Sequence, residues 1–274
     1  MKKIIAMLLV LTMVLAFAGC ASNTPAPTTV PETTVAPETT VAPETTVAPE
    51  TTEAAAAAMT HEEYIAAELD TEVTVETYVQ AKQGWWTDDQ GISKATFYCQ
   101  SEDGAYFLYD MPCSEEDYNA MTVGTKIRVT GYKAEWSGEV EIVDATYEIL
   151  EGTYVAEALD VTELLASEDL IAHQNEFVAF TGLTIAPSTD ANGNEAAFLY
   201  NWDRSGSQGN DLYFNVTVGE NTYNFCVESY LCGADTDVYK AVEALEIGDV
   251  INAEGFLYWY DGANPHITSV TVVE

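Results

Sequence analysis

The chain has 274 residues, of which 45 are acidic and only nine are lysine or arginine, so its formal net charge is −36. Residues 59–152 hold 20 acidic and five basic side chains, and residues 153–274 hold 20 and two. Proteins that bind phosphate backbones use lysine and arginine to displace counterions. A chain so acidic throughout repels polyanions unless its few basic residues cluster, and its charge favours solubility.

The first twenty residues are typical of a cleaved secretory signal. Lys2 and Lys3 precede an apolar run over residues 4–17, and small residues follow before Cys20. The run is short for a membrane span. Ala18-Gly19-Cys20 resembles the lipobox of bacterial lipoproteins, which implies cleavage before Cys20, acylation of its thiol by chains such as palmitate, and anchoring on the outer, extracytoplasmic face of the cell membrane. The alternative is an ordinary signal cleaved elsewhere, with Cys20 incidental.

Residues 21–58 predict a disordered linker. They repeat Thr-Thr-Val-Ala-Pro-Glu and end in an alanine run. Regular prolines remove backbone donors, and the low apolar content cannot offset the entropy of ordering. Extended at about 3.1 Å per residue, the segment reaches on the order of 100 Å. We therefore expect a stalk that holds the folded part, residues 59–274, away from the membrane.

The folded part contains an internal repeat, which divides it into domains at 59–152 and 153–274. Residues 123–131 read Val-Gly-Thr-Lys-Ile-Arg-Val-Thr-Gly, and residues 247–255 read Ile-Gly-Asp-Val-Ile-Asn-Ala-Glu-Gly. The glycines match in spacing, and apolar residues alternate between them as in a strand. Each stretch therefore predicts a turn, a strand and a second turn.

Each copy has the same predicted order of elements, namely helix, three strands, helix and two strands. Thr60-x-x-Glu63 and Asp160-x-x-Glu163 are typical of helix N-termini, and so is Ser114-x-x-Asp117. The second internal helix should begin near Asp235. In the first copy, strands 1 to 3 are predicted near residues 72–80, 95–100 and 105–111. In the second copy they are predicted near residues 176–186, 211–218 and 222–229.

A helix between strands 3 and 4 of a five-stranded unit is the order of the OB-fold. The Gly-x-x-apolar-x-apolar-x-Gly stretch resembles OB modules of secreted bacterial proteins. The chain therefore resembles a bacterial surface lipoprotein with tandem OB-fold-like domains, mainly β with short helices. An insertion at residues 200–210 departs from the pattern and puts the extent of the second barrel in doubt.

The resemblance implies a ligand site on strands 2 and 3 and on the loops that connect strands 1–2 and 4–5. Aromatic residues occupy these places, and flat rings with polar tips suit stacking on bases or sugars. Strand tyrosines more often fill a barrel core, whereas adjacent aromatic residues alternate in direction, so some must face outward. The candidate residues are Trp85, Trp86, Tyr98, Tyr106, Trp136, Trp202, Tyr213, Tyr258, Trp259 and Tyr260.

The ligand class stays open between a cell-envelope glycan and a surface protein. A glycan needs rings, acids and amides without a positive field, which suits this composition. Single-stranded nucleic acid is the alternative that the resemblance implies, and it needs a basic groove. Its candidate basic residues lie in the first copy: Lys82, Lys94, Lys126, Arg128 and Lys133.

We expect that the protein is not an enzyme and that it binds no cofactor or metal. The sequence has three histidines and no catalytic or nucleotide-binding motif, although a carboxylate-dependent hydrolase is a further alternative. Residues 190–195 alternate oxygen-bearing side chains but lack the spacing of a calcium loop, so a polar turn is the better interpretation. Cys99, Cys113, Cys226 and Cys232 allow three disulfide pairings or buried free thiols, and the sequence does not choose between them.

Overall fold

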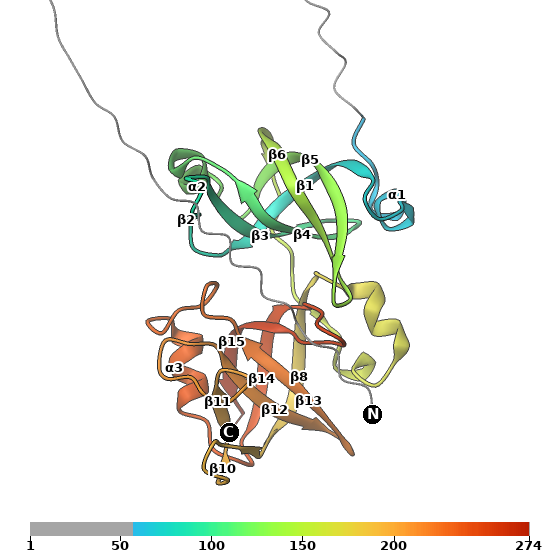
Figure 1. Cartoon of the computed structure of the whole chain (residues 1–274). Helices are drawn as coiled ribbons and strands as arrows, with labels where there is room; N and C mark the ends of the chain where they lie inside the picture. The colour runs from blue at the N-terminus through green and yellow to red at the C-terminus, as the bar shows by residue number, and fades with distance from the viewer. Residues whose placement is uncertain (1–56, 274) are drawn as a thin grey trace, which may run out of the picture. The chain divides into compact units, whose positions relative to one another are not determined.

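The computed structural model describes residues 57–273, which form two β-barrels (Figure 1). Barrel 1 covers residues 59–153 and barrel 2 covers residues 159–272. The signal segment, Cys20 and nearly all of the predicted linker lie outside the described residues. Within residues 57–273, none of the helices is both long and apolar enough to cross a lipid bilayer.

Barrel 1 closes through a complete circuit of strand pairs. Strand β1 pairs with β3, β3 with β4, β4 with β6, β6 with β5, and β5 again with β1. Only the β4–β6 pair is parallel. With the helix between β4 and β5, this is the strand order of the OB-fold. The elements are α1 (His61–Ala66), β1 (Glu72–Lys82), β2 (Trp86–Thr87), β3 (Ser93–Ser101), β4 (Gly104–Pro112), α2 (Glu115–Ala120), β5 (Thr125–Trp136) and β6 (Glu139–Thr153).

Barrel 2 repeats the circuit with β8, β12, β13, β15 and β14, and its β13–β15 pair is again parallel. The predicted tandem OB-fold architecture is confirmed. The elements are β7 (Leu159–Asp160), η1 (Thr162–Leu164), η2 (Glu168–His173), β8 (Phe177–Ala186), β9 (Ser188–Thr189), β10 (Glu195–Ala196), β11 (Phe198–Tyr200), β12 (Leu212–Val218), β13 (Asn221–Val227), α3 (Asp237–Glu243), β14 (Val250–Phe256) and β15 (His266–Val272).

The helix ends follow the predicted caps in all but one place. Thr60 forms a capping box with Glu63, and Ser114 caps α2 through the backbone N–H of Asp117. The α-helix predicted from Asp160 is wrong. Leu159 and Asp160 pair with β8 as a short strand, so the chain after them forms only the 3₁₀ turns η1 and η2.

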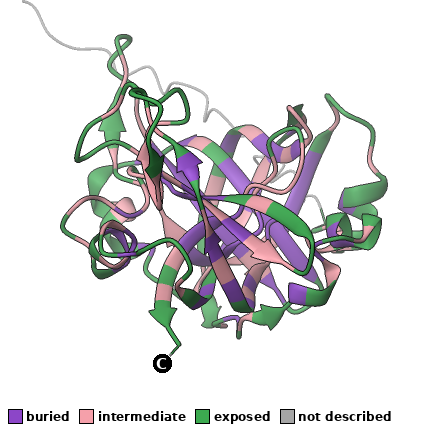
Figure 2. Ribbon diagram, turned by 90° about the horizontal axis from the view of Figure 1, so that it is seen from below, coloured by how far each residue is buried: buried purple, intermediate pink, exposed green. Residues whose placement is uncertain are grey.

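Each barrel has its own apolar core. Long stretches of the strands are coloured as buried in Figure 2. Tyr106 belongs to the core of barrel 1, where its ring packs on Tyr64 with centroids 5.1 Å apart. It is 1% exposed, so the interpretation of Tyr106 as a ligand-binding residue is wrong. The four cysteines other than Cys20 are buried free thiols. Burial raises the pKa of Cys113 and Cys232 to about 11, which keeps both protonated.

The insertion in the second copy does not open barrel 2. Strand β11 adds to β12, and the segment then covers α3. The Tyr200 hydroxyl donates to Glu243 Oε1 at 2.6 Å, and the Tyr239 hydroxyl donates to the Asn210 carbonyl at 2.7 Å. The insertion is therefore a tethered surface segment outside a closed barrel.

The two barrels contact each other through a small aromatic cluster. Tyr98, Phe107 and Phe256 are all buried in it. The Tyr98 hydroxyl lies 2.7 Å from Nδ1 of His266, and the ring of Tyr258 stacks on His266 at 4.1 Å. Tyr98 was a ligand-binding candidate, but at 1% exposure it is a contact between barrels instead, because the strand 2–3 face of barrel 1 is covered by barrel 2.

Glu139, at the start of β6, is a second contact between the barrels. Its Oε2 accepts hydrogen bonds from the backbone N–H of Trp259 at 2.9 Å and from Gln174 Nε2 at 3.3 Å. The side chain is fully buried, and the loss of hydration raises its pKa to about 8. At neutral pH this carboxyl is therefore largely protonated.

The repeated glycine at the end of each motif is explained by a close approach of backbones. A Cβ on Gly131 would lie 2.7 Å from the carbonyl oxygen of Val143, and one on Gly255 would lie 2.2 Å from that of His266. Both positions lie where the strand 4–strand 5 register shifts. The sequence repeat therefore marks the same bulge in both barrels.

We predict that Gly255→Ala destabilises the protein by about 2–3 kcal/mol, because the added methyl group must displace the backbone of β15. Gly84→Ala is the control, since a Cβ there meets nothing within 4 Å. Urea denaturation followed by tryptophan fluorescence measures both. A Gly255→Ala chain as stable as the Gly84→Ala chain would contradict the assigned bulge.

We predict that Glu139→Gln weakens the pH dependence of stability between about pH 5 and pH 8. Since the pKa of Glu139 is raised on folding from 4.5 to about 8, the folded state retains a proton that the unfolded state releases. The free energy of unfolding therefore falls as pH rises through this window, and glutamine removes that contribution. Urea titrations at several pH values measure it, and an unchanged slope in the Glu139→Gln chain would contradict the raised pKa of Glu139.

Candidate ligand-binding groove

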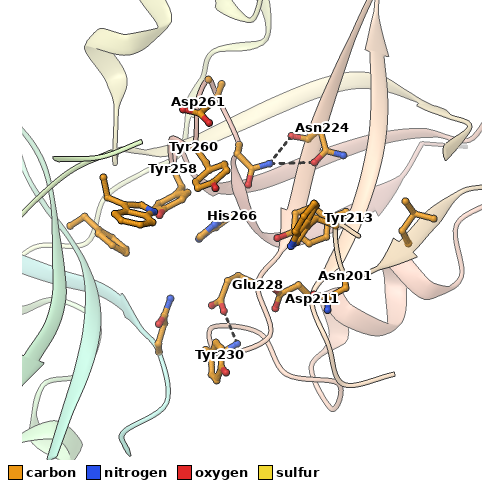
Figure 3. Close-up of a pocket in the computed structure, with 18 of the residues that line it drawn as sticks. Asn201, Asp211, Tyr213, Asn224, Glu228, Tyr230, Tyr258, Tyr260, Asp261 and His266 are labelled. Atoms are coloured by element: carbon orange, nitrogen blue, oxygen red, sulfur yellow. Dashed lines mark hydrogen bonds between the residues drawn. The ribbon is translucent and has the colours of Figure 1, made fainter. Parts of the chain in front are cut away.

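A groove of about 1470 Å³ is lined by residues of both barrels. Figure 3 shows side chains from barrel 2 converging on it, with Tyr258, Tyr260 and His266 on one side and Tyr213, Asp211 and Glu228 on the other. The backbone N–H of Gly84 donates to the carbonyl of Tyr230 at 3.0 Å, which links the two barrels beside the groove. The aromatic residues that line it are Trp85, Trp86, Phe107, Tyr109, Trp136, Trp202, Tyr213, Tyr230, Tyr258 and Tyr260.

Trp85 and Trp86 contribute different surfaces to the groove. Trp85 packs against the core of barrel 1 and donates its indole N–H to the carbonyl of Cys113 at 3.1 Å. Trp86 pairs with Lys94 across β2–β3 and is 45% exposed. The ammonium of Lys94 lies 4.6 Å from the Trp86 ring and forms ion pairs with Asp88 and Asp110 at 3.3 Å. The expectation that one of the two rings faces outward is met by Trp86.

Trp136 stands at the tip of the β5–β6 hairpin and is 61% exposed. Ser137 and Gly138 form the turn with positive φ angles of 50° and 91°. A tight turn of this kind fixes the end of both strands. The hairpin therefore presents a nearly free indole ring from a rigid support.

The loop between strands 4 and 5 of barrel 2 contains three aromatic residues, Tyr258, Trp259 and Tyr260, which differ in how far they are buried. Tyr260 is 54% exposed beside a turn in which Asp261 has a φ of 52°. Tyr258 lines the groove while stacked on His266. Trp259 does not line the groove; it packs on the core of barrel 2 and against Gly138 of barrel 1. Trp259 is therefore not placed to bind a ligand in the groove, whereas its neighbours Tyr258 and Tyr260 are.

The 1–2 loop and strand 2 of barrel 2 supply Trp202 and Tyr213. Trp202 is 74% exposed within the inserted segment, and Tyr213 is half-buried on β12. Both line the groove. The insertion thus has a consequence beyond covering α3, because it places a free indole beside the barrel.

Sequence reasoning missed two exposed tyrosines and all of the amides. Tyr109 turns outward beside Asp110, whose positive φ of 48° interrupts β4, and Tyr230 lies in the turn after β13. Alternation along strand 3 could have indicated Tyr109. Nothing local in the sequence brings together the amides, which come from separate loops and strands. They are Gln83, Asn201, Asn215, Asn224 and Asn264.

Acidic side chains outnumber basic ones in the groove. Asp211 and Glu228 cap loop backbone: Asp211 Oδ1 accepts from Ser229 N at 2.9 Å, and Glu228 accepts from Tyr230 N at 3.1 Å (Figure 3) and Leu231 N at 2.9 Å. Burial, reinforced by Asp211, raises the pKa of Glu228 to about 7. Asp110 and Asp261 complete the acidic set, and among the described residues Arg204 is the only basic residue that lines the groove.

The basic residues of barrel 1 do not gather into a second groove. Lys126 and Arg128 both pair with Glu76, the former at 2.7 Å. The ammonium of Lys133 is buried against the backbone carbonyls of α1 and the residues after it, and that of Lys82 donates to the Tyr118 carbonyl. Each of these four cations is therefore held by a partner within barrel 1.

The structure also shows how the acidic segment at residues 190–195 is folded. Asp190 Oδ1 accepts from the backbone N–H groups of Asn192 and Asn194, both at 2.8 Å, and the segment joins β9 to β10. It is the polar hairpin turn that the sequence predicted. Across residues 57–273, no group of three or more His, Cys, Asp or Glu side chains could hold a metal ion.

The strand order and the groove define a class: a tandem OB-fold protein whose two barrels share an aromatic groove. No protein-family model matches the chain, and no curated protein matches it. Solved structures similar to it include a murine DNA-binding protein bound with double-stranded DNA, with a TM-score of 0.36 and 9% identity over 73% of this chain and 96% of that one.

Two further solved structures show the same low level of likeness. The tetrameric p202 HIN2 has a TM-score of 0.32 and 12% identity over 76% of this chain and 96% of that one. A deletion mutant of the single-stranded DNA-binding protein from Thermus aquaticus has a TM-score of 0.25 and 13% identity over 74% and 94%. The assignment of the fold rests on the strand circuits, not on these likenesses.

Proposed function

We propose that this chain is a lipid-anchored, non-catalytic surface protein that binds a glycan chain in the groove shared by its two barrels. The observation that carries the proposal is the lining of that groove, where exposed rings from both barrels lie among amides and carboxylates with a single arginine. OB-folds in general bind oligosaccharides or oligonucleotides on this side of the barrel. The lining of this groove supports the first of the two.

The exposed rings provide stacking surfaces for sugars. Trp136, Trp202 and Tyr260 are each more than half exposed, although burying such rings is favourable. They come from three different loops of the two barrels. Since a pyranose has an apolar face of C–H groups, it can cover an indole or phenol ring without requiring a positive charge. Several separate rings suit a chain of sugars better than a single one.

The amides supply the polar half of sugar recognition. Asn264 Nδ2 donates to the Asn224 carbonyl at 3.2 Å, and Asn224 Nδ2 donates to Asn215 Oδ1 at 2.9 Å. These contacts, drawn in part in Figure 3, hold the amide groups in fixed orientations. Pre-oriented amides and carboxylates can bond to hydroxyl groups with little loss of side-chain entropy on binding.

Single-stranded nucleic acid is the second candidate, because the same fold binds it by stacking beside a basic channel. The rings meet the first requirement. The groove does not meet the second, since its acidic residues oppose phosphates and the barrel 1 cations are held by internal partners. Charge therefore favours an uncharged glycan over a polyanion.

A hydrolase is less well supported than a binding protein. The carboxylate of Glu228 has the raised pKa of a proton donor, about 7. However, its two oxygens cap the backbone N–H groups of Tyr230 and Leu231, and Asp211 is bound by Ser229. These hydrogen bonds account for the two carboxylates as supports of the groove wall.

We predict that Trp136→Ala and Tyr260→Ala each weaken glycan binding about tenfold, because each removes a stacking ring. The full-length chain is titrated with soluble N-acetylglucosamine oligomers and tested for sedimentation with bacterial cell-wall glycan. Tyr132→Ala is the matched control, since Tyr132 is 44% exposed on β5 and does not line the groove.

The same titrations include oligo-dT. Tight binding of oligo-dT that falls steeply with salt, without binding of either glycan, would replace the proposal with the nucleic-acid alternative. Equal losses in the Tyr132→Ala and Trp136→Ala chains would show that the groove is not the site.

We predict that Cys20→Ser releases the protein from the membrane fraction of the cells that secrete it, because the thiol that carries the acyl chains is removed. Cell fractionation and mass spectrometry of the mature N-terminus measure this. Cys113→Ser is the control, as Cys113 is a buried thiol of barrel 1. Retention of the Cys20→Ser chain in the membrane would contradict lipid anchoring.

A further inference from the structure

The turn of the β5–β6 hairpin in barrel 1 is bound directly to the loop between β14 and β15 of barrel 2. The Ser137 carbonyl accepts a hydrogen bond from the backbone N–H of Asp261 at 2.7 Å. Two residues further along, Glu139 Oε2 accepts from the Trp259 N–H at 2.9 Å. Because both bonds join the same short turn to the same loop, the turn and the loop are fixed relative to each other.

Gly138 lies between these two bonds and is in close contact with barrel 2. Its carbonyl accepts a hydrogen bond from Gln174 Nε2 at 2.8 Å. A Cβ on Gly138 would lie 2.8 Å from Cδ1 of Trp259, so the indole ring packs directly on the glycine. Since Trp259 also packs against the core of barrel 2, its ring cannot move aside without moving the loop. A side chain at position 138 would therefore push the turn and the loop apart.

The turn and the loop each carry one exposed ring into the groove. Trp136 immediately precedes Ser137, and Tyr260 immediately precedes Asp261, as Figure 3 shows for the loop. Bond lengths and the hydrogen bond between Ser137 and Asp261 allow the Cα atoms of the two aromatic residues to lie at most about 11 Å apart. Since both side chains line the same groove, one ligand chain can reach both rings.

Both rings stand on supports with internal hydrogen bonds of their own. Trp136 is paired with Glu139 across the turn. In the loop, the Tyr260 N–H donates to the Gly262 carbonyl at 2.8 Å. Backbone held in this way does not have to be ordered when a ligand binds, which lowers the entropic cost of binding.

We propose that Gly138 and Trp259 are positioning residues that hold Trp136 and Tyr260 as one paired stacking site, which makes the groove selective for the longer members of a glycan series. The proposal rests on the glycan function proposed above. When one ring holds a unit of the chain, the other ring meets the next units at a high effective concentration. A sugar too short to reach both rings gains only one contact.

The size of the groove agrees with an extended ligand. Its volume of about 1470 Å³ exceeds the range of about 300–1,000 Å³ that is usual for sites that bind one small molecule. Trp136 and Tyr260 lie at the place where the two barrels are joined, so a chain that covers both rings contacts both barrels.

Gly138→Ala tests the pairing, because the added methyl group separates the turn from the loop while both rings remain in the chain. The full-length chain is titrated calorimetrically with the hexamer and with the dimer of N-acetylglucosamine. We expect the unmodified chain to bind the hexamer more tightly than the dimer. In the Gly138→Ala chain, binding of the hexamer should weaken about tenfold, while binding of the dimer should not change.

Gly193→Ala is the matched control. The φ of Gly193 is 85° and that of Gly138 is 91°, but a Cβ on Gly193 meets nothing within 4 Å, and Gly193 does not line the groove. An unchanged hexamer affinity in the Gly138→Ala chain, an equal loss for hexamer and dimer, or an equal loss in the Gly193→Ala chain would overturn the proposal. If the Gly138→Ala chain does not fold, Gln174→Ala, which removes the donor to the Gly138 carbonyl, should weaken hexamer binding alone.

Hydrogen exchange of the backbone amides, followed by NMR without a ligand, tests the positioning separately from the glycan. The Asp261 N–H, which is bonded to Ser137, should exchange about tenfold faster in the Gly138→Ala chain than in the unmodified or the Gly193→Ala chain. Equal exchange in all three chains would overturn the positioning role even if glycans bind. If neither oligomer binds the unmodified chain, the glycan function fails, and exchange at Asp261 still decides whether Gly138 holds the turn and the loop together.

Discussion

The packing of Tyr98, Phe107 and Phe256 between the barrels is the contact on which the rest of the structure depends. It covers the strand 2–3 face of barrel 1, the place where an isolated OB-fold would hold a ligand. The loops at the edge of that face then meet the loops of barrel 2, and the shared groove results. His266 reinforces the contact because it stacks on Tyr258 while bonded to Tyr98, and burial lowers its pKa to about 3, which keeps it neutral.

The two barrels have the same circuit of strands, and this limits how they can contact each other. Among the described residues, no strand of one barrel pairs with a strand of the other, so the two barrels meet through side chains and loops. Here β6 begins with Glu139, and the 4–5 loop of barrel 2 donates the Trp259 N–H to it. This polar contact buries the Glu139 carboxyl and raises its pKa to about 8. The stability of the contact between the barrels therefore depends on pH.

The sequence predicted the fold well because its strongest signals are local. Matching glycines at Gly131 and Gly255 mark a bulge that any residue with a Cβ would obstruct, and the caps at Thr60 and Ser114 define helix starts. The site was predicted less evenly. Loop residues such as Trp136 and Trp202 were identified, whereas Tyr98 and Trp259 were misassigned, because burial between barrels depends on docking that no pattern within one copy encodes.

Electrostatics and the lining of the groove together favour an uncharged ligand. In the groove, carboxylates are partly used to support loops, and the free surface is mostly ring and amide, which suits hydroxyl-rich, uncharged ligands. An anion is disfavoured there, because the lining contains four acidic side chains and a single arginine. The acidity of the chain therefore acts at the groove as well as over the surface, since it selects against phosphate-bearing ligands.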